Sequence, residues 1–197
     1  MLAIVDSGGA NIASVRFALE RLGVHGELTA DPAVIRAAER VILPGVGSAQ
    51  EGMKRLQAKG LVACVRGLQQ PVLGICLGMQ LLFEASEEGH TPSLGLVPGR
   101  VARLLESPGI TVPHMGWNTL DLRKPTPLLQ GFDAATRFYF VHSFAGPVNE
   151  FTLASCTHGT AFAAVVQRGN FWGVQFHPER SGAAGARLLR NFLEMPA

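Results

Sequence analysis

The stretch "VLGICLGMQLL", residues 72–82, decides the fold because it sets a cysteine between two glycines where an apolar run gives way to a helical pattern. Gly74, Cys76 and Gly78 have the spacing of a nucleophile elbow, a sharp strand-to-helix turn that strains its central residue and requires small neighbours. A thiol at that turn lies at a helix N-terminus, where the dipole and free N–H groups favour the thiolate. We therefore expect Cys76 to be a nucleophile and the backbone N–H of Leu77 to face an oxyanion.

The other two cysteines lack this context. Cys64 lies on a helical stripe in "LVACVRGL" and Cys156 lies in an apolar strand pattern, so we expect both to belong to the core. Free cysteine is commonly buried in this way. For Cys76 the elbow pattern favours a nucleophile over a buried core residue.

Strand and helix patterns alternate through the first half of the chain. Asn11 is a candidate N-cap and Gly23 a candidate terminator of one helix, while Ser48 and Glu51 have capping-box spacing at the start of another. Repeated strand–helix units of this length indicate a parallel sheet with helices on both faces. The expected units are strand 2–6 with helix 11–23, strand 40–44 with helix 48–60, and strand 72–75 with helix 77–86.

From about residue 94 the chain becomes rich in strand patterns. "QRGN", residues 167–170, joins two apolar arms and predicts a hairpin, and residues 185–195 have the pattern of a closing helix. We predict a single α/β domain over residues 1–197, with a mixed, mainly parallel central sheet flanked by helices. The expected later strands are 99–105, 138–144, 151–156 and the arms of 162–177.

Composition excludes several classes of function. Of 197 residues, 47% are hydrophobic and 16% charged, the net charge is +2, and no block of Lys and Arg is present, so neither nucleic acid nor a membrane surface is an expected partner. Three widely spaced cysteines without a CxxC pattern favour a reducing cytoplasm and predict no zinc site. No apolar run reaches the length of a bilayer span, and no motif calls for a cofactor.

A cysteine nucleophile requires a base and a group that orients the base. In "GVQFHPER" His177 ends an apolar strand pattern, and Glu179 follows two residues later, where strand geometry places both side chains on one side. Glu179 would then hold the imidazole tautomer. Taken alone, such a pair is also compatible with a surface salt bridge or half of a metal site, but further ligands at suitable spacing are lacking.

A third element is "LPGVG", residues 43–47, between an expected strand and an expected helix. Gly45 and Gly47 permit backbone conformations that turn N–H groups towards a cavity, although a plain turn has the same pattern. All three elements fall at strand ends, where ligand sites of open α/β sheets occur.

The motifs "PGVG", "GICLGMQLLF" and "GVQFHPE", in this order, resemble those of the class I, or triad, glutamine amidotransferases, over residues 2–193. The resemblance implies that Cys76 attacks the side-chain amide of glutamine and forms a thioester, that His177 is base and then acid, and that Glu179 orients it. It further implies oxyanion positions at Val46, Gly47 and Leu77 and substrate contacts at Gln80, Glu88, Gly45, Ser143 and Phe144.

Two further stretches, "PHMGWN" at 113–118 and "YFVHSF" at 139–144, are similar to the branch of the family that passes ammonia to a separate (β/α)8 cyclase subunit in histidine biosynthesis. The resemblance implies a heterodimer with a sealed tunnel, because ammonia in neutral water is protonated and ceases to be a nucleophile. The family often has a lysine where Arg180 stands, and the two are not interchangeable at a close contact. The implied interface residues are Asn11, His114, Met115, Trp117, Asn118, Tyr139 and Arg180.

Three alternatives stay open at this point. The chain is also of the right length for the glutaminase of another synthase, such as pyridoxal phosphate synthase, which the "PHMGWN" motif disfavours. A non-catalytic α/β binding module would be expected to lack part of the triad. A general cysteine hydrolase would act on other amides and esters.

Overall fold

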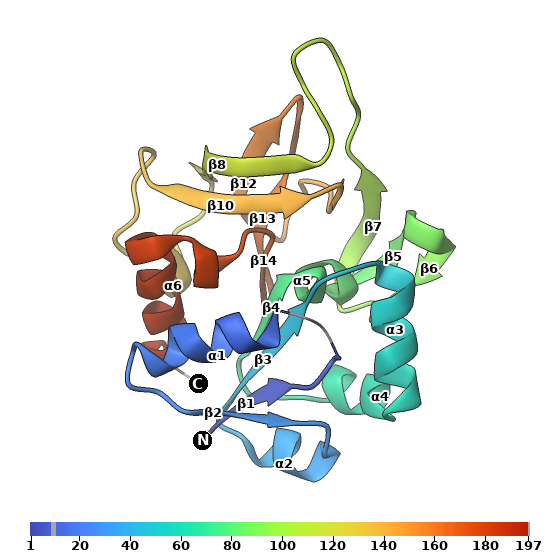
Figure 1. The fold of residues 1–197 in the computed structure, drawn as a ribbon, viewed down its shortest axis with the longest axis vertical. Helices are drawn as coiled ribbons and strands as arrows, with labels where there is room; N and C mark the ends of the chain where they lie inside the picture. The colour runs from blue at the N-terminus through green and yellow to red at the C-terminus, as the bar shows by residue number, and fades with distance from the viewer. Residues whose placement is uncertain (9–10, 197) are drawn as a thin grey trace.

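The computed structural model describes residues 1–8 and 11–196, and its centre is an eight-stranded sheet with strand order β2-β1-β3-β4-β14-β13-β12-β9 (Figure 1). The pairs from β2 to β14 are parallel and those from β14 to β9 antiparallel, which confirms the mixed, mainly parallel sheet. The strands are β1 (Leu2–Val5), β2 (Gly26–Thr29), β3 (Arg40–Gly45), β4 (Val72–Cys76), β9 (Asp121–Leu122), β12 (Thr152–His158), β13 (Thr160–Arg168) and β14 (Phe171–Val174).

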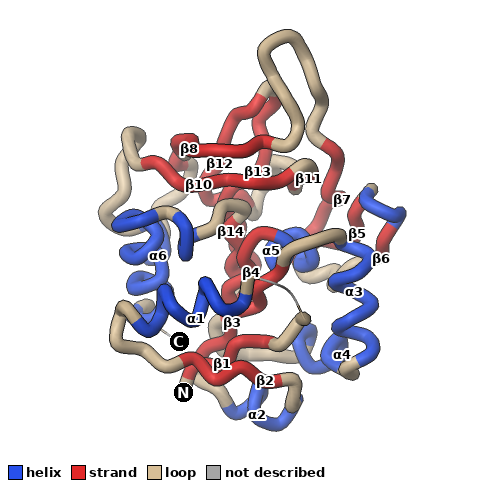
Figure 2. Tube along the Cα trace, in the orientation of Figure 1, coloured by secondary structure: helices blue, strands red, loops and turns tan. Residues whose placement is uncertain are grey.

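Helices cover both faces of this sheet, as the alternating pattern predicts (Figure 2). One core cluster packs α1 and α6 against the sheet through side chains such as Leu19 and Leu188. The second contains side chains of α2 to α5, among them Leu56 and Leu77. The helices are α1 (Ile12–Glu20), α2 (Pro32–Ala37), α3 (Ala49–Ala58), α4 (Leu61–Arg66), α5 (Leu77–Leu82) and α6 (Gly182–Glu194), with 3-10 turns η1 (Glu88–His90), η2 (Pro127–Leu129) and η3 (Pro178–Arg180).

Two smaller sheets lie beside the main one (Figure 1). The strands β8 (His114–Thr119) and β10 (Arg137–His142) form an antiparallel pair, and the buried rings of Phe138 and Phe140 on β10 belong to the same core cluster as the buried side chains of α6. The other sheet has the order β11-β7-β5-β6, with β5 (Phe83–Ser86), β6 (Thr91–Pro92), β7 (Val97–Arg103) and β11 (Phe144–Ala145).

The expected helix over residues 77–86 is wrong in its second half. The helix ends at Leu82, and Phe83 is extended at φ −68° and ψ 172° before β5 pairs with β7. The returning chain satisfies the free helix carbonyls, because the N–H groups of Leu94 and Leu96 donate to the carbonyls of Leu81 and Leu82. Tertiary pairing therefore outweighs the helical period here.

Residues 24–38 contain two elements that hydrophobic periodicity did not predict. The edge strand β2 is largely exposed, so it lacks an apolar pattern. The short helix α2 has local signals, since Pro32 occupies its first turn and the Asp31 carboxylate accepts from the Ala33 N–H at 2.8 Å.

Several local predictions are confirmed. Ser48 caps α3 by accepting from the Glu51 N–H at 3.3 Å, and the hairpin at 167–170 pairs Arg168 with Phe171. Helix α1 stops at Glu20, a little before the expected Gly23, and α6 begins slightly earlier than expected. In the part of the chain that the structure describes, no helix has the length and apolarity needed to cross a bilayer.

Candidate active site

The elbow at the end of β4 has the strained geometry that its sequence predicts. Cys76 has φ +52° and ψ −109°, and α5 begins at the next residue. A Cβ on Gly74 would lie 2.8 Å from the Gly78 carbonyl carbon, and a Cβ on Gly78 would lie 1.8 Å from the Leu43 carbonyl oxygen. Both glycines are therefore required by close backbone contacts around the cysteine.

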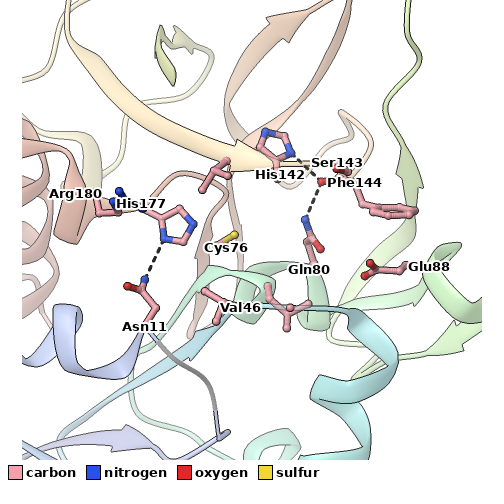
Figure 3. A pocket seen from close by; sticks show the side chains of 13 residues that line it. Asn11, Val46, Cys76, Gln80, Glu88, His142, Ser143, Phe144, His177 and Arg180 are labelled. Atoms are coloured by element: carbon pink, nitrogen blue, oxygen red, sulfur yellow. Dashed lines mark hydrogen bonds between the residues drawn. The ribbon is translucent and has the colours of Figure 1, made fainter. Parts of the chain in front are cut away.

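The elbow opens into a cavity of about 430 Å³, shown in Figure 3. Its walls come from the elbow, from the loop after β3, from η1, from the end of β10 and from η3. Val141 and His142 belong to the lining although the sequence did not single them out. The predicted site residues that line it are Asn11, Val46, Gly47, Cys76, Leu77, Gln80, Glu88, Ser143, Phe144, His177 and Arg180.

Cys76, His177 and Glu179 converge although a hundred residues separate the first from the other two. The Nδ1 of His177 lies 2.7 Å from the Glu179 Oε1, which leaves its Nε2 for the sulfur of Cys76. Strand geometry is not what aligns the pair, because β14 ends at Val174 and Glu179 lies in η3. The 3-10 turn instead brings the Glu179 carboxylate to the Nδ1 edge of the ring.

The electrostatics of this row favour a charged imidazole. Burial opposes protonation of His177, but the nearby Cys76 sulfur, the hydrogen bond to Glu179 and the charges of both groups raise the pKa of His177 well above its usual value. The side chain of Glu179 is fully buried, and that of His177 is 4% exposed. The site therefore favours a protonated imidazole beside the Cys76 sulfur.

Asn11 is a member of this constellation rather than a helix cap. It occupies the N-cap position of α1 without a capping bond, and its Nδ2 donates to the Glu179 Oε1 at 2.5 Å. The same Nδ2 is 3.2 Å from the His177 Nδ1 (Figure 3). Since that nitrogen donates to Glu179, the acceptor of the Asn11 amide is the carboxylate, and both donors hold one oxygen.

The other side of the sulfur carries two glutamines. Gln80 donates through Nε2 to the Phe144 carbonyl at 2.7 Å and to the Gln175 Oε1 at 3.0 Å. Gln175 is fully buried and places its own Nε2 3.7 Å from the Cys76 sulfur. Sequence reasoning missed Gln175, although it lies two residues before His177 and thus on the same side of an extended chain.

The structure places only part of the loop after β3 where the predicted roles of its residues require. Val46 and Gly47 line the cavity, and Gly47 has φ +96°, a conformation that favours glycine. Gly45, expected to contact substrate, instead packs against the elbow, because a Cβ there would lie 2.9 Å from the Gly78 nitrogen. Glu88 faces the cavity opposite His177, and its Oε2 accepts from the Ala49 N–H at 2.7 Å (Figure 3).

The expected interface residues divide between two faces of the β8/β10 pair. Met115 is 63% exposed and Trp117 53% exposed, and the Trp117 ring meets Tyr139 edge-on at 5.9 Å. The Arg180 guanidinium lies 4.8 Å over the Tyr139 ring, beside the cavity. His114 is instead only 4% exposed, so its expected role as a polar anchor for a partner does not match its inward position.

The buried His142 predicts a loss of stability in acid. Burial lowers the pKa of His142 to about 3, so the folded protein keeps this ring neutral while the unfolded chain protonates it near pH 6.5. Its contribution to the free energy of unfolding is complete above pH 6.5 and is lost as pH falls towards 3, by roughly 2 kcal/mol at pH 5. Denaturant unfolding at pH 7 and pH 5 should show a larger loss for the natural protein than for His142→Gln. Equal losses would contradict this assignment.

Metal ligands do not gather anywhere in residues 1–8 and 11–196, where no three His, Cys, Asp or Glu side chains form a group that could hold an ion. The chemistry available in the cavity is that of the thiol, the imidazole and the carboxylate, with the two glutamine amides beside them.

Sequence comparison gives a consistent result. The chain matches the model of the family described as glutamine amidotransferase class-I over residues 3–195. A protein of Xanthomonas axonopodis pv. citri, named imidazole glycerol phosphate synthase subunit HisH, is 57% identical over 194 residues, which cover 98% of this chain and 97% of that protein. A protein of the same name from Xylella fastidiosa is 56% identical over 196 residues, covering 100% of this chain and 98% of that protein.

Solved structures are similar at much lower identity. A crystal structure of a glutamine amidotransferase has a TM-score of 0.76 at 20% identity and covers 98% of this chain and 97% of its own. A structure of PurLQS from Thermotoga maritima has a TM-score of 0.69 at 20% identity, with 98% of this chain and 96% of that chain covered. At these identities the likeness concerns the fold alone.

Proposed function

The chain belongs to the class I glutamine amidotransferase family, and from that premise we propose that it is the glutaminase subunit of an imidazole glycerol phosphate synthase. The observation that carries the proposal is that Cys76 and His177 line one cavity while Glu179 is hydrogen-bonded to His177 from behind. Nucleophile, base and orienting carboxylate are what hydrolysis of an amide through a thioester requires. The two relatives that bear this subunit's name support this synthase over another.

The reaction begins at the thiolate of Cys76. Its sulfur attacks the side-chain amide carbon of glutamine, and His177 donates the Nε2 proton to the amide nitrogen, so the C–N bond breaks and ammonia leaves a glutamyl thioester. Water then attacks the thioester carbon while the neutral ring of His177 takes a proton. Cleavage of the C–S bond releases glutamate and restores the thiolate–imidazolium pair.

Glu179 and Asn11 keep the ring of His177 in its working position. The carboxylate accepts the Nδ1 proton at 2.7 Å, which keeps Nε2 directed at the sulfur through both steps. The Asn11 amide holds the same oxygen at 2.5 Å and limits its rotation. Both are positioning groups, since neither contacts the reacting carbon.

Stabilisation of the oxyanion is assigned to backbone donors on the two loops beside Cys76. The N–H of Leu77 begins α5, and the loop of Val46 and Gly47 lies beside it, because β3 pairs Gly45 with Cys76. A well-placed donor of this kind contributes on the order of 3 kcal/mol to the transition state. The freedom of Gly47 at φ +96° allows the loop to reorient its N–H groups.

Recognition of glutamine follows from the charges in the cavity. Glu88 supplies a carboxylate for the α-ammonium group, at the end of the cavity away from His177 (Figure 3). Gln80 lies between that end and Cys76, with Ser143 and Phe144 on the neighbouring wall (Figure 3). An extended glutamine then spans the cavity with its amide at the sulfur.

The product requires a partner. Ammonia that escapes into water is protonated, so a (β/α)8 cyclase subunit that seals the cavity mouth preserves its reactivity, and we assign the outer face of β8 and β10 to this heterodimer. Met115 and Trp117 are the exposed apolar residues there, and Met and Trp are enriched at interface centres. Arg180 links this face to the cavity by touching both.

A cytoplasmic location is part of the same proposal. The mechanism requires Cys76 as a free thiol, and Cys64, Cys76 and Cys156 are all unpaired in the structure. A reducing compartment maintains that state.

Glutamate release measured with and without the cyclase partner and its ligand tests this function. We expect slow hydrolysis by the isolated chain and stimulation by the liganded partner. Equally fast hydrolysis in both cases would reject the coupling, and comparable turnover of unrelated amides and esters would indicate a general cysteine hydrolase.

The interface assignment is tested in the same assay by Trp117→Ala. Loss of a central tryptophan commonly costs about 2 kcal/mol or more of binding, so the dissociation constant of the heterodimer should rise by about 30-fold. Leu28→Ala is the matched control, because Leu28 is 41% exposed on β2, an edge strand of the main sheet, whereas β8 and β10 form a separate sheet. Equal effects of the two variants would exclude this face as the partner site.

A further inference from the structure

We propose that Asn118, His114 and His142 form a positioning chain that holds the glutamine pocket in place from strand β8. The inference deepens the proposed function and rests on it, because the pocket concerned is the one assigned to glutamine. These three residues act through the Phe144 carbonyl and do not touch the reacting atoms.

Three hydrogen bonds connect the members of the positioning chain. His114 on β8 lies directly opposite His142 on β10, and the His114 Nδ1 is 3.0 Å from the His142 Nε2. The His142 Nδ1 is 2.8 Å from the Phe144 carbonyl oxygen, and the Asn118 Nδ2 is 3.2 Å from the His114 Nε2. Every ring nitrogen of the two histidines thus has one partner.

The direction of these bonds follows from the acceptor at one end. A carbonyl only accepts, so the His142 Nδ1 carries the proton and its Nε2 must accept from the His114 Nδ1. The His114 Nε2 is then an acceptor, which the Asn118 amide satisfies. The Asn118 side chain is itself oriented, because its Oδ1 accepts from the Thr119 N–H at 2.8 Å and its Nδ2 also donates to the Thr157 carbonyl at 3.1 Å.

The surroundings keep both rings neutral and in place. His114 is 4% exposed and His142 6%, and His114 stacks between Phe140 at 4.8 Å and His158 at 4.3 Å. The His158 ring is held in turn by a 2.7 Å bond to the Thr111 carbonyl. Burial lowers the pKa of His114 to about 4 and that of His142 to about 3, which suits neutral tautomers with defined donors and acceptors.

The far end of the positioning chain reaches the substrate cavity. The Phe144 carbonyl accepts from His142 and from the Gln80 Nε2, so both of its lone pairs are used (Figure 3). Gln80 continues to Gln175, whose Nε2 approaches the Cys76 sulfur at 3.7 Å. The strand that presents Met115 and Trp117 outward therefore fixes the orientation of Gln80 from its inner side.

The tautomers give a direct test on the natural protein. Two-bond ¹⁵N–¹H correlation spectra distinguish a proton on Nδ1 from one on Nε2, and free histidine prefers Nε2. We expect neutral His114 and His142 with the proton on Nδ1 of both rings at pH 7. A proton on the Nε2 of either ring would overturn the proposal.

Asn118→Asp tests the consequence for the site. A carboxylate cannot donate to the His114 Nε2, so that ring loses the tautomer on which His142 depends. With saturating cyclase we expect the KM for glutamine to rise about tenfold, the effect of one lost hydrogen bond, while kcat changes less than about twofold. An unchanged KM would overturn the proposal.

Asn191→Asp is the matched control. Asn191 on α6 also donates to two carbonyls, of Leu128 and Gln130, but it lies away from the cavity. The KM of Asn191→Asp for glutamine should therefore equal that of the natural protein. An equal rise in both variants would indicate general loosening and overturn the proposal. Absence of glutamine hydrolysis by the natural complex would refute the proposed function instead, while the tautomers would still report on the positioning chain.

Discussion

Cys76→Ala should lower glutamine hydrolysis by about 10⁴-fold or more, because the thioester route disappears with the sulfur. The substitution removes only the sulfur atom of a side chain that is 7% exposed, so we expect the backbone of the elbow to keep its conformation. Synthesis driven by added ammonium salt should continue in the complex at the natural rate, since the cyclase then needs nothing from the cavity. Glutamate release and imidazole glycerol phosphate formation are measured side by side.

Cys64→Ala is the control for this substitution. Cys64 is a buried thiol on α4 whose pKa is raised by burial, and its sulfur contacts the Pro32 carbonyl rather than a base. We expect the glutaminase activity of Cys64→Ala to stay within about twofold of that of the natural protein, and we expect a modest loss of stability because the substitution leaves a small cavity. Persistent hydrolysis by Cys76→Ala would remove Cys76 as the nucleophile.

Gly78→Ala should be among the most destabilising single methyl additions in the chain. The new Cβ would lie 1.8 Å from the Leu43 carbonyl oxygen, and neither strand β3 nor helix α5 can yield without moving the elbow. We expect the free energy of unfolding to fall by on the order of 3 kcal/mol or more, as for severe overpacking. Glutaminase activity should be lost in whatever fraction stays folded, because Cys76 moves with the helix.

Gly67→Ala gives the comparison for that prediction. Gly67 follows α4 at φ −94°, where an added Cβ has its nearest contact at 3.4 Å, so alanine is accommodated. Denaturant unfolding of both variants should show a change within about 1 kcal/mol for Gly67→Ala. If Gly78→Ala were equally mild, the close approach of α5 to β3 would not be the reason for glycine at the elbow.

The positive φ of Cys76 connects these two predictions. A non-glycine residue in that region stores about 1–3 kcal/mol of strain, which only tight packing on both sides maintains. Glycines at 74 and 78 supply the space for that packing, and the thiol gains its position at the start of α5 as a result. Stability and catalysis therefore depend on the same contacts.

Short stretches of sequence were sufficient to predict many of the structural features of this protein. The glycine spacing around Cys76, the cap at Ser48 and the hairpin near Gly169 each depend on steric limits within a few residues, so the sequence predicts them directly. The alternation of apolar runs with helical periods predicted the parallel sheet, because consecutive strand–helix units place neighbouring strands in the same direction. The family motifs then indicated which residues carry the chemistry.

The tertiary structure alone decided how distant groups meet. Nothing local predicts that the Asn11 amide binds Glu179 instead of its own helix, or that residues 83–86 leave the helical path to pair with β7. The same holds for the inward turn of His114 towards His142. Such contacts join residues far apart in the chain, and a buried polar group takes whichever partner the packed core presents, because leaving it unpaired costs more than abandoning a local bond.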